Sequence, residues 1–181
     1  NPDLVAHIFV TTNGAAAAGG IATLLITWIR YGKPTFSLTL NGVLAGLVAV
    51  TAGCDVVTPG GAIVIGFLAG ILVVFSVEFF DRKLKVDDPV GAVSVHGVCG
   101  AFGTLMVGLF SANPELPGLF YGGDTSVLVS QFIGVLAIAA WAGVTGTALF
   151  SLLKYTIGIR VSAKEEEIGL DYFEHGEKAY N

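Results

Sequence analysis

The most chemically distinctive side chain of the sequence is the imidazole of His96, which lies in a run of small and apolar residues from Ala92 to Gly103. Asp88 and Pro89 precede this run and are typical of a helix start, because aspartate caps free backbone amides and proline suits the first helical position. At about 1.5 Å per residue, His96 would then lie roughly 10 Å along the helix from Pro89. We therefore expect a helix with one histidine well inside it.

The spacing around His96 predicts what surrounds its ring. Cys99, Gly100 and Gly103 follow it by three, four and seven residues, and Ala92 precedes it by four. Residues at these separations share one face of an α-helix. We therefore expect His96 to stand on a stripe of small residues, where another helix packs closely or a narrow channel stays open. A neutral imidazole has one donor and one acceptor, and both need partners in apolar surroundings.

Three roles fit a histidine in this place. It hydrogen-bonds to a neighbouring helix, it joins Cys99 in a metal or haem site, or it lies on a pathway for a substrate or for protons. A complete metal site needs further ligands, and the apolar segments add only His7 and Cys54, both expected near the outer surface. We therefore expect no metal and no cofactor. Ionisable groups inside membranes commonly mark pathways, which favours the third role over simple packing.

The composition indicates that the element positioning His96 is a membrane helix. Charged residues make up 13% of the chain, about half the share in a soluble domain. The 25 glycines are typical of transmembrane helices, in which backbones approach closely. Several apolar segments also reach the roughly 20 residues that cross a bilayer. The sequence thus predicts an all-α, polytopic integral membrane protein.

Five membrane spans are predicted. Their approximate limits are Leu4–Ile29, Phe36–Ala52, Gly61–Phe80, Pro89–Phe110 and Ser126–Ile157. The fifth is longer than a span requires, so we expect it to tilt or to project from the membrane. Residues 158–181 are polar and are not a span. The expected division is a helical bundle over residues 1–157 and a tail over residues 158–181.

Basic residues predict the orientation of these spans in the cell membrane. All nine fall on one side, after the first, third and fifth spans: Arg30, Lys33, Arg82, Lys83, Lys85, Lys154, Arg160, Lys164 and Lys178. The loops on the other side, residues 53–60 and 111–125, contain acidic residues but no lysine or arginine. Because positive charge favours the cytoplasmic side, the tail is expected in the cytoplasm and Asn1 outside.

The start of the chain suggests a larger parent. Asn1 is not a methionine, and no cleavable signal segment precedes the first span, so we expect a piece of a longer chain or a processed product. Cys54 and Cys99 are expected at different depths, which argues against a disulfide bond between them.

Four motifs together carry a resemblance to a known family. They are DDPVGAVSVHGVCG at 87–100, NGVLAGLVAVTAGC at 41–54, GGAIVIG at 60–66, and GIRV at 158–161 followed by GLDYFEHGEKAY at 169–180. In this order they resemble late transmembrane helices and the cytoplasmic tail of the ammonium transporter family, which is related to the Rhesus glycoproteins. The resemblance extends over nearly the full length of the chain.

The resemblance implies a fold and an assembly. Members of the family have eleven membrane helices arranged as two inverted five-helix repeats, and they form homotrimers with one pore in each subunit. The five predicted spans and the tail resemble helices seven to eleven, which is the carboxyl-terminal half. The first repeat, with the other pore histidine, would then lie outside this chain. The amino and carboxyl ends implied by the family agree with the orientation predicted from charge.

The resemblance also implies a mechanism and site residues. His96 matches the later of two histidines that share a hydrogen bond in a narrow hydrophobic pore, and Ala92 matches a pore-lining position. Ammonium would lose a proton on passage, so that neutral ammonia crosses while potassium and sodium are excluded. Asn41 and Thr51 match positions nearer the two ends of their helix, where either side chain alternatively caps or packs. Gly91 stands where some relatives carry an acidic residue.

The tail has two interpretations. On its own composition it is a solvated, partly disordered end. By its resemblance it docks on the inner face of the trimer, couples the pores, and offers a site for a nitrogen-regulatory protein of the PII class. Gly169 and Gly176 indicate backbone turns with positive φ or close approach. Asp171 would accept hydrogen bonds from the inner loops of a neighbouring subunit, and the motif implies that His175 organises the tail. Phe173 replaces the phosphorylatable threonine of plant relatives.

Other functions remain as alternatives. An ammonium sensor that signals through its tail, a gas channel of Rhesus type, and a membrane metalloenzyme each fit part of the pattern. The leading hypothesis is transport of ammonium, and of its methylated analogue, with no enzymatic activity. The expected partners are a lipid bilayer, two further copies of the subunit and a PII-class protein, with no nucleic acid.

Overall fold

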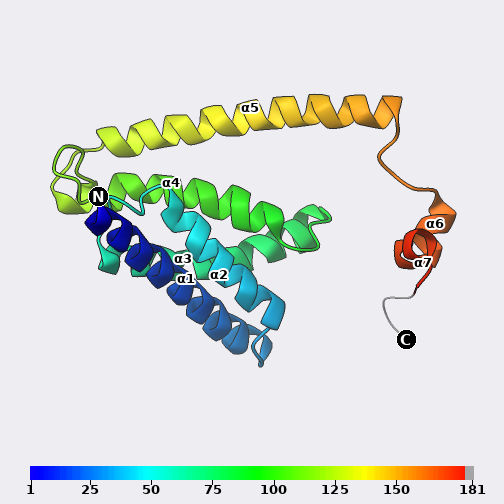
Figure 1. Cartoon of the computed structure of the whole chain (residues 1–181), viewed down its shortest axis with the longest axis horizontal. Helices are drawn as coiled ribbons and strands as arrows, with labels where there is room; N and C mark the ends of the chain where they lie inside the picture. The colour runs from blue at the N-terminus through cyan, green and yellow to red at the C-terminus, as the bar shows by residue number, and fades with distance from the viewer. Residues whose placement is uncertain (178–181) are drawn as a thin grey trace. The chain divides into compact units, whose positions relative to one another are not determined.

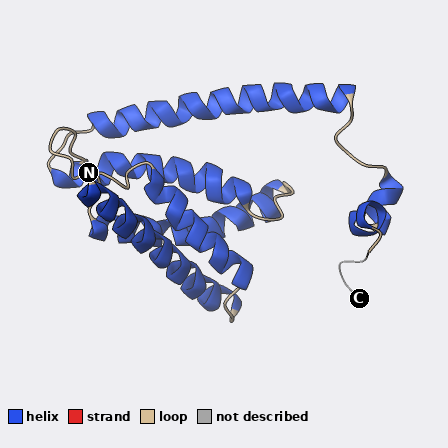
Figure 2. Cartoon of the chain, in the orientation of Figure 1, coloured by secondary structure: helices blue, strands red, loops and turns tan. Residues whose placement is uncertain are grey.

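The computed structural model describes residues 1–177, which form helices joined by short loops (Figure 1). The longer helices are α1 (Pro2–Tyr31), α2 (Phe36–Thr51), α3 (Pro59–Glu78), α4 (Cys99–Phe110) and α5 (Ser126–Thr156). The shorter ones are the π-helices η1 (Phe79–Leu84) and η2 (Val93–Val98), the 3₁₀ turn η3 (Leu119–Tyr121), and α6 (Ala163–Ile168) and α7 (Leu170–His175). Figure 2 shows helices and loops throughout the described residues, which confirms the all-α class.

Four helical segments are long and apolar enough to cross a membrane: Pro2–Tyr31, Pro59–Leu84, Val93–Phe110 and Ser126–Thr156. They correspond to the first, third, fourth and fifth predicted spans. The second predicted span, α2, has 16 residues, fewer than the roughly 20 that cross a bilayer. At about 1.5 Å per residue it extends roughly 24 Å, less than a hydrocarbon core of about 30 Å. Residues 1–177 thus contain four candidate membrane spans and one shorter apolar helix, the pattern of a multi-pass membrane protein.

Local sequence explains where the first and third helices begin. The side chain of Asn1 accepts a hydrogen bond of 3.0 Å from the amide of Asp3, and Pro2 occupies the first turn. The hydroxyl of Thr58 caps α3 in the same way, accepting 3.1 Å from the amide of Gly61 with a proline at the first position. Both arrangements satisfy amides that a helix leaves free at its start.

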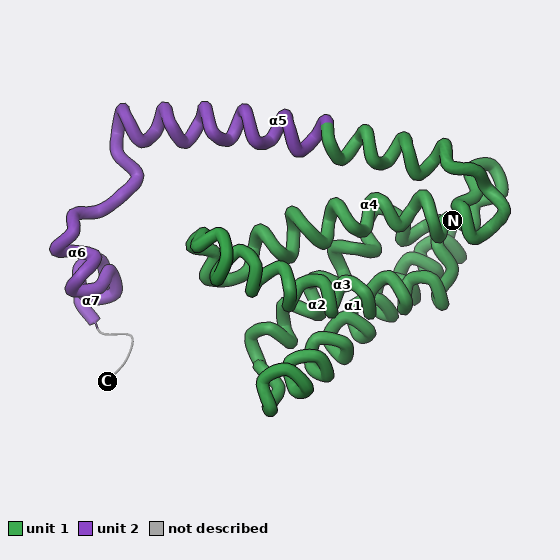
Figure 3. The backbone as a smooth tube through the Cα atoms, turned by 180° about the vertical axis from the view of Figure 1, so that it is seen from behind, with its two compact units in different colours: residues 1–136 green, residues 137–181 purple. Residues whose placement is uncertain are grey.

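The chain divides into two compact units, which Figure 3 draws in different colours. The first comprises residues 1–136, and the second begins at Ala137. Their boundary falls within α5. The division into a bundle over residues 1–157 and a tail beyond it stays a prediction.

Small residues at the helix crossings bring the backbones of the first unit together. A β-carbon on Gly46 of α2 or on Gly66 of α3 would collide with the backbone oxygen of Ala15 in α1. The hydroxyl of Thr23 reaches between two of these helices and donates 2.7 Å to the oxygen of Gly70. Close backbone contact and hydroxyl bonds of this kind hold membrane helices together, because apolar side chains gain little by leaving lipid for another helix.

Candidate functional site

The helix that carries His96 begins later than the sequence predicts. The backbone oxygen of Asp88 accepts a hydrogen bond of 3.0 Å from the amide of Gly91, which forms a tight turn that includes Pro89. Gly91 has φ +70°, which takes the chain off a helical path. The prediction that Pro89 occupies the first helical position is therefore wrong, and the helix starts after Gly91. His96 lies roughly 6 Å from Ala92 at the new start, at about 1.5 Å per residue, and not 10 Å inside.

Asp88 nevertheless interacts with the free amides at this helix start. Its Oδ1 accepts 2.8 Å from the amide of Ala92, and its Oδ2 accepts 3.0 Å from that of Val93. The carboxylate therefore spans the turn and binds both amides at once. A negative charge at this end of a helix is also favourable to the helix dipole.

A second contact fixes the same turn from another helix. The side-chain amide of Asn41, in α2, donates 3.0 Å to the backbone oxygen of Val90. A β-carbon on Gly91 would lie 2.7 Å from that amide nitrogen. Asn41 thus joins the site through the backbone of the turn. The structure brings Asn41, Asp88 and Gly91 together around the helix start.

Thr51 does not join this group. It is the last residue of α2, and its hydroxyl donates 2.7 Å to the oxygen of Leu47 in the same helix. The contact is a local one of the kind that caps or ends a helix. The hydroxyl bonds back to the carbonyl one turn earlier in its own helix, and a vestibule role for Thr51 stays a prediction.

His96 lies in the π-helical segment η2, and its side chain is exposed, as is that of Ala92. Cys99 is fully buried, and Gly103 meets the backbone of Ala49 so closely that a β-carbon would collide with it. The prediction of one stripe running through His96, Cys99 and Gly103 is therefore wrong. The physical reason is the π-helical turn, because its hydrogen bonds span five residues and it rotates whatever precedes it relative to α4.

The ring of His96 makes no hydrogen bond to any other residue in the described range 1–177. A role in packing this set of helices gains no support from that geometry. Cys99, the one sulfur near it in sequence, points its thiol at the oxygen of Ala69, 3.8 Å away. Within residues 1–177 no group of three or more histidine, cysteine or acidic side chains comes together to hold a metal.

Sequence reasoning missed a buried pair of serines beside this histidine. The hydroxyl of Ser76, in α3, donates 2.9 Å to the hydroxyl oxygen of Ser94, in η2. Their exposed fractions are 7% and 0%. The available signal was a single serine in each of two mostly apolar spans. Nothing in the spacing of those spans predicts that they meet.

An open pocket of about 490 Å³ lies away from these residues, lined by His7, by residues 55–59 and by residues 112–114. One ring nitrogen of His7 is 2.9 Å from the oxygen of Val57, so that end of the ring is held by the backbone. None of the predicted site residues lines this pocket.

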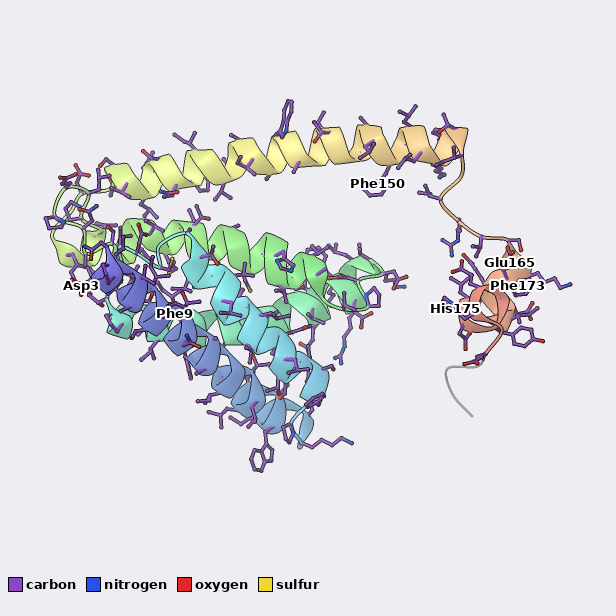
Figure 4. All side chains as sticks on the ribbon, viewed as in Figure 1. Asp3, Phe9, Phe150, Glu165, Phe173 and His175 are labelled. Carbon is purple, nitrogen blue, oxygen red and sulfur yellow. The ribbon has the colours of Figure 1, made fainter. Side chains whose placement is uncertain are left out.

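The second unit contains the predicted tail motif. Gly169 has φ +102° and Gly176 has φ +71°, which confirms the predicted positive φ at both glycines. They flank α7, which holds Asp171 in its first turn and His175 in its last. Figure 4 labels Phe173 and His175 on this helix, and both side chains are exposed. Over the described residues 169–177 the tail motif is thus one short helix between two glycine turns, and the rest of the motif, including Lys178, lies outside the described residues.

A capping box starts the helix before it. The amide of Ser162 donates 2.7 Å to the carboxylate of Glu165, and the amide of Glu165 donates 3.3 Å to the Ser162 hydroxyl. These hydrogen bonds hold the pKa of Glu165 below its usual value. Arg160 and Glu166 add an exposed ion pair of 2.6 Å. Local interactions therefore order a segment whose composition alone suggests disorder.

The sequence over residues 2–180 matches the Ammonium Transporter Family. The chain belongs to this family. It is 42% identical over 185 aligned residues to the ammonium transporter Amt2 of Archaeoglobus fulgidus, a match that covers 97% of this chain and 39% of that protein. It is 43% identical over 179 residues to a putative ammonium transporter of Synechocystis sp., covering 98% of this chain and 38% of that one. The chain therefore spans about two-fifths of the length of these curated relatives.

Solved structures of ammonium transporter relatives share the helical arrangement. A protein described as a sensor Amt protein superposes with a TM-score of 0.87 at 35% identity, covering 94% of this chain and 42% of that one. Mep2 of Candida albicans superposes with a TM-score of 0.80 at 28% identity, covering 88% and 37%. The ammonium transporter fold is thus shared by all the parts of the chain that align. The family places the chain among transporters rather than enzymes.

Proposed function

We propose that the chain is the carboxyl-terminal half of an ammonium transporter, corresponding to helices seven to eleven of that fold. In this assignment α2 also crosses the membrane, as the second of five spans, with its shorter length compensated by loops at its ends. The share of relatives covered, about two-fifths, supports a half-length segment. The nine basic residues on one predicted side support a cytoplasmic tail.

We further propose that His96 lines the path taken by ammonium and that Ala92 forms part of the apolar wall beside it. A bare cation carries a heavy desolvation cost in hydrocarbon surroundings. Removing one proton lets neutral ammonia cross an apolar constriction that excludes potassium and sodium. An imidazole suits this step because it accepts a hydrogen bond at one nitrogen and donates one at the other.

One observation carries this proposal. His96 is exposed on the described helices and makes no hydrogen bond with them, although it lies inside a segment apolar enough to span a membrane. A histidine in that position requires a partner from elsewhere, because an unpaired polar group in hydrocarbon is costly. A permeating molecule, or a second histidine in the first half of the transporter, supplies such a partner.

The test is His96→Ala in the full-length transporter that contains these residues. We expect uptake of labelled methylammonium to fall sharply, or to become sensitive to potassium, with assembly largely intact because the neighbouring residues are small. His7→Ala is a matched control, because His7 lies near the start of α1 and its ring is hydrogen-bonded to the backbone oxygen of Val57. Normal, potassium-resistant uptake by the His96→Ala protein that still assembles, together with a lower yield of assembled protein, would refute the pore role and favour packing.

The tail is proposed to couple the pores of a homotrimer and to offer the inner face to a PII-class regulator. Asp171 would accept hydrogen bonds from the basic inner loop of a neighbouring subunit, where Arg82, Lys83 and Lys85 lie. Such contacts are partly solvated and worth about 1 kcal/mol or less each. Their effect would therefore come from setting the position of α7 rather than from added stability.

A second candidate function is sensing. The superposition on a protein described as a sensor covers 94% of this chain at a TM-score of 0.87, and this match favours keeping that alternative. The two functions differ in one measurable respect. A transporter accumulates methylammonium in vesicles, whereas a sensor binds ammonium without net uptake.

A further inference from the structure

The π-helical turn η2 determines which residues face the α2 and α3 helices. Counting from Cys99 at about 100° per residue, an α-helix would place Ala92 about 20° from it and Ser94 roughly 140° away. Ala92 would then be buried with Cys99, and Ser94 would face outward. The structure has the opposite arrangement, with Ala92 exposed and Ser94 fully buried. The widened turn has therefore exchanged the faces of these two residues.

The same rotation applies to His96. In an α-helix it would lie about 60° from Cys99, on the packed side, whereas in the structure it is exposed beside Ala92. An α-helical register would therefore press the imidazole toward neighbouring helices and draw Ser94 away from Ser76. The direction of the His96 side chain and the position of Ser94 are thus two consequences of the same π-helical backbone conformation.

A π-helical turn is intrinsically rare and needs contacts that favour it. Here the contact is the hydrogen bond of 2.9 Å from Ser76 to Ser94, which forms only when Ser94 faces α3. Both serines are buried, with exposed fractions of 7% and 0%. Losing the bond would leave a buried hydroxyl without that partner, which costs free energy in an apolar interior.

We propose that Ser76 is a positioning residue, which acts through Ser94 to hold the π-helical register that directs His96 and Ala92 onto the open face of the helix. The effect on transport rests on the pore role proposed above for His96. The effect on register does not, because it concerns only which side chains are exposed. The two claims are therefore separable by experiment.

The register is measured with a thiol introduced by Ala92→Cys in the full-length transporter. A small charged methanethiosulfonate reagent is the probe, and peptide mass spectrometry follows the labelled position so that Cys54 and Cys99 do not interfere. We expect ready labelling when Ser76 is present and several-fold slower labelling when Ser76→Ala is added. Gly97→Cys is the control probe, since that position is exposed and lies roughly 160° from Cys99 even in an α-helix.

Two further variants separate register from general damage. Ser111→Ala removes another buried serine hydroxyl, one that donates 2.8 Å to Leu116, and should leave labelling unchanged. Ser76→Thr retains a hydroxyl and should restore the labelling rate. Equal labelling with Ser76 and with Ser76→Ala, or no labelling of Ala92→Cys even with Ser76 present, overturns the positioning role.

Methylammonium uptake by the same variants tests the linked claim. We expect Ser76→Ala to lower uptake or its resistance to potassium, and Ser76→Thr to restore both. A clear loss of labelling with uptake and selectivity unchanged would support the positioning role of Ser76 and refute the proposed pore role of His96 and Ala92.

Discussion

The side-chain amide of Asn41 donates a hydrogen bond of 3.0 Å to the backbone oxygen of Val90, the residue before the one at φ +70°. An asparagine in one apolar helix thereby fixes the point at which another helix starts. Because the acceptor is a backbone oxygen, the bond does not depend on the side chain of residue 90, whereas a side chain at residue 91 would crowd the Asn41 amide. The lack of a side chain at Gly91 thus suits this contact as well as its own positive φ angle.

The first prediction concerns Gly91→Ala and Gly91→Asp. Both add a β-carbon at positive φ, which costs about 1–2 kcal/mol, and both place it 2.7 Å from the Asn41 nitrogen. We expect each variant to lower the unfolding temperature of the purified transporter, with the aspartate no better tolerated than the alanine. Gly97→Ala is the control, because its β-carbon would meet only Val93, at 3.9 Å. An unchanged melting temperature for Gly91→Ala would contradict the importance of this turn.

The second prediction concerns the carboxyl-terminal ends of α1 and α3. Glu78 accepts 2.9 Å from Nε and 2.7 Å from Nη2 of Arg30, and 2.6 Å from the hydroxyl of Tyr31. A lysine cannot reproduce this forked contact. Solvent screens the exposed guanidinium of Arg30, whereas removing the Glu78 carboxylate deletes the acceptor of all three contacts, so Glu78→Ala should destabilise more than Arg30→Lys. Thermal denaturation in detergent measures both, with the exposed Lys33→Ala as control, and equal effects of all three would disprove the ranking.

The third prediction concerns pH and the capping box of α6. The depressed pKa of Glu165 means that its contribution to helix stability is present above the usual glutamate pKa and is lost as pH falls through the lowered folded value. Deuterium exchange across residues 162–168, corrected for intrinsic rates, should therefore accelerate in acid. Glu165→Gln should remove this pH dependence, whereas Glu167→Gln should keep it. An acid response that survives in Glu165→Gln would assign the effect to another group.

The fourth prediction concerns coupling by the tail. Gly169→Asp places a side chain at φ +102°, with its β-carbon 2.6 Å from the Asp171 carboxylate, so we expect α7 to shift. In mixed trimers of the proposed assembly this variant, like Asp171→Ala, should reduce uptake more than in proportion to the mutant subunits, at an unchanged membrane level. Strict proportionality between mutant fraction and lost uptake would rule out coupling between pores.

Much of the fold is predictable from the sequence because membrane helices are defined by length and apolarity. The predicted second span, Phe36–Ala52, differs from the observed helix Phe36–Thr51 by one residue. The positive φ angles of Gly169 and Gly176 were also predictable, because the segment that they flank gives no other reason for a small residue. Each of these features depends on local sequence.

The surroundings of His96 were less predictable, because tertiary contacts determine them. Asn41 comes from α2 and Ser76 from α3, and together they set where the helix starts and how it is wound. The sequence of that helix alone favours regular α-helical spacing, which placed His96 on the wrong face. A π-helical turn has no local signature in a run of small apolar residues, so only the packed structure shows it.

The contact of Gly46 and Gly66 with one backbone oxygen, that of Ala15, has a mechanical consequence. The helices α1, α2 and α3 meet there with no side chain of Gly46 or Gly66 between their backbones. Close contact at this point resists a small displacement of any one helix against the other two. In the proposed transport function, small changes of shape within α1, α2 and α3 would then occur by displacement of this triplet as a block rather than by sliding between its members.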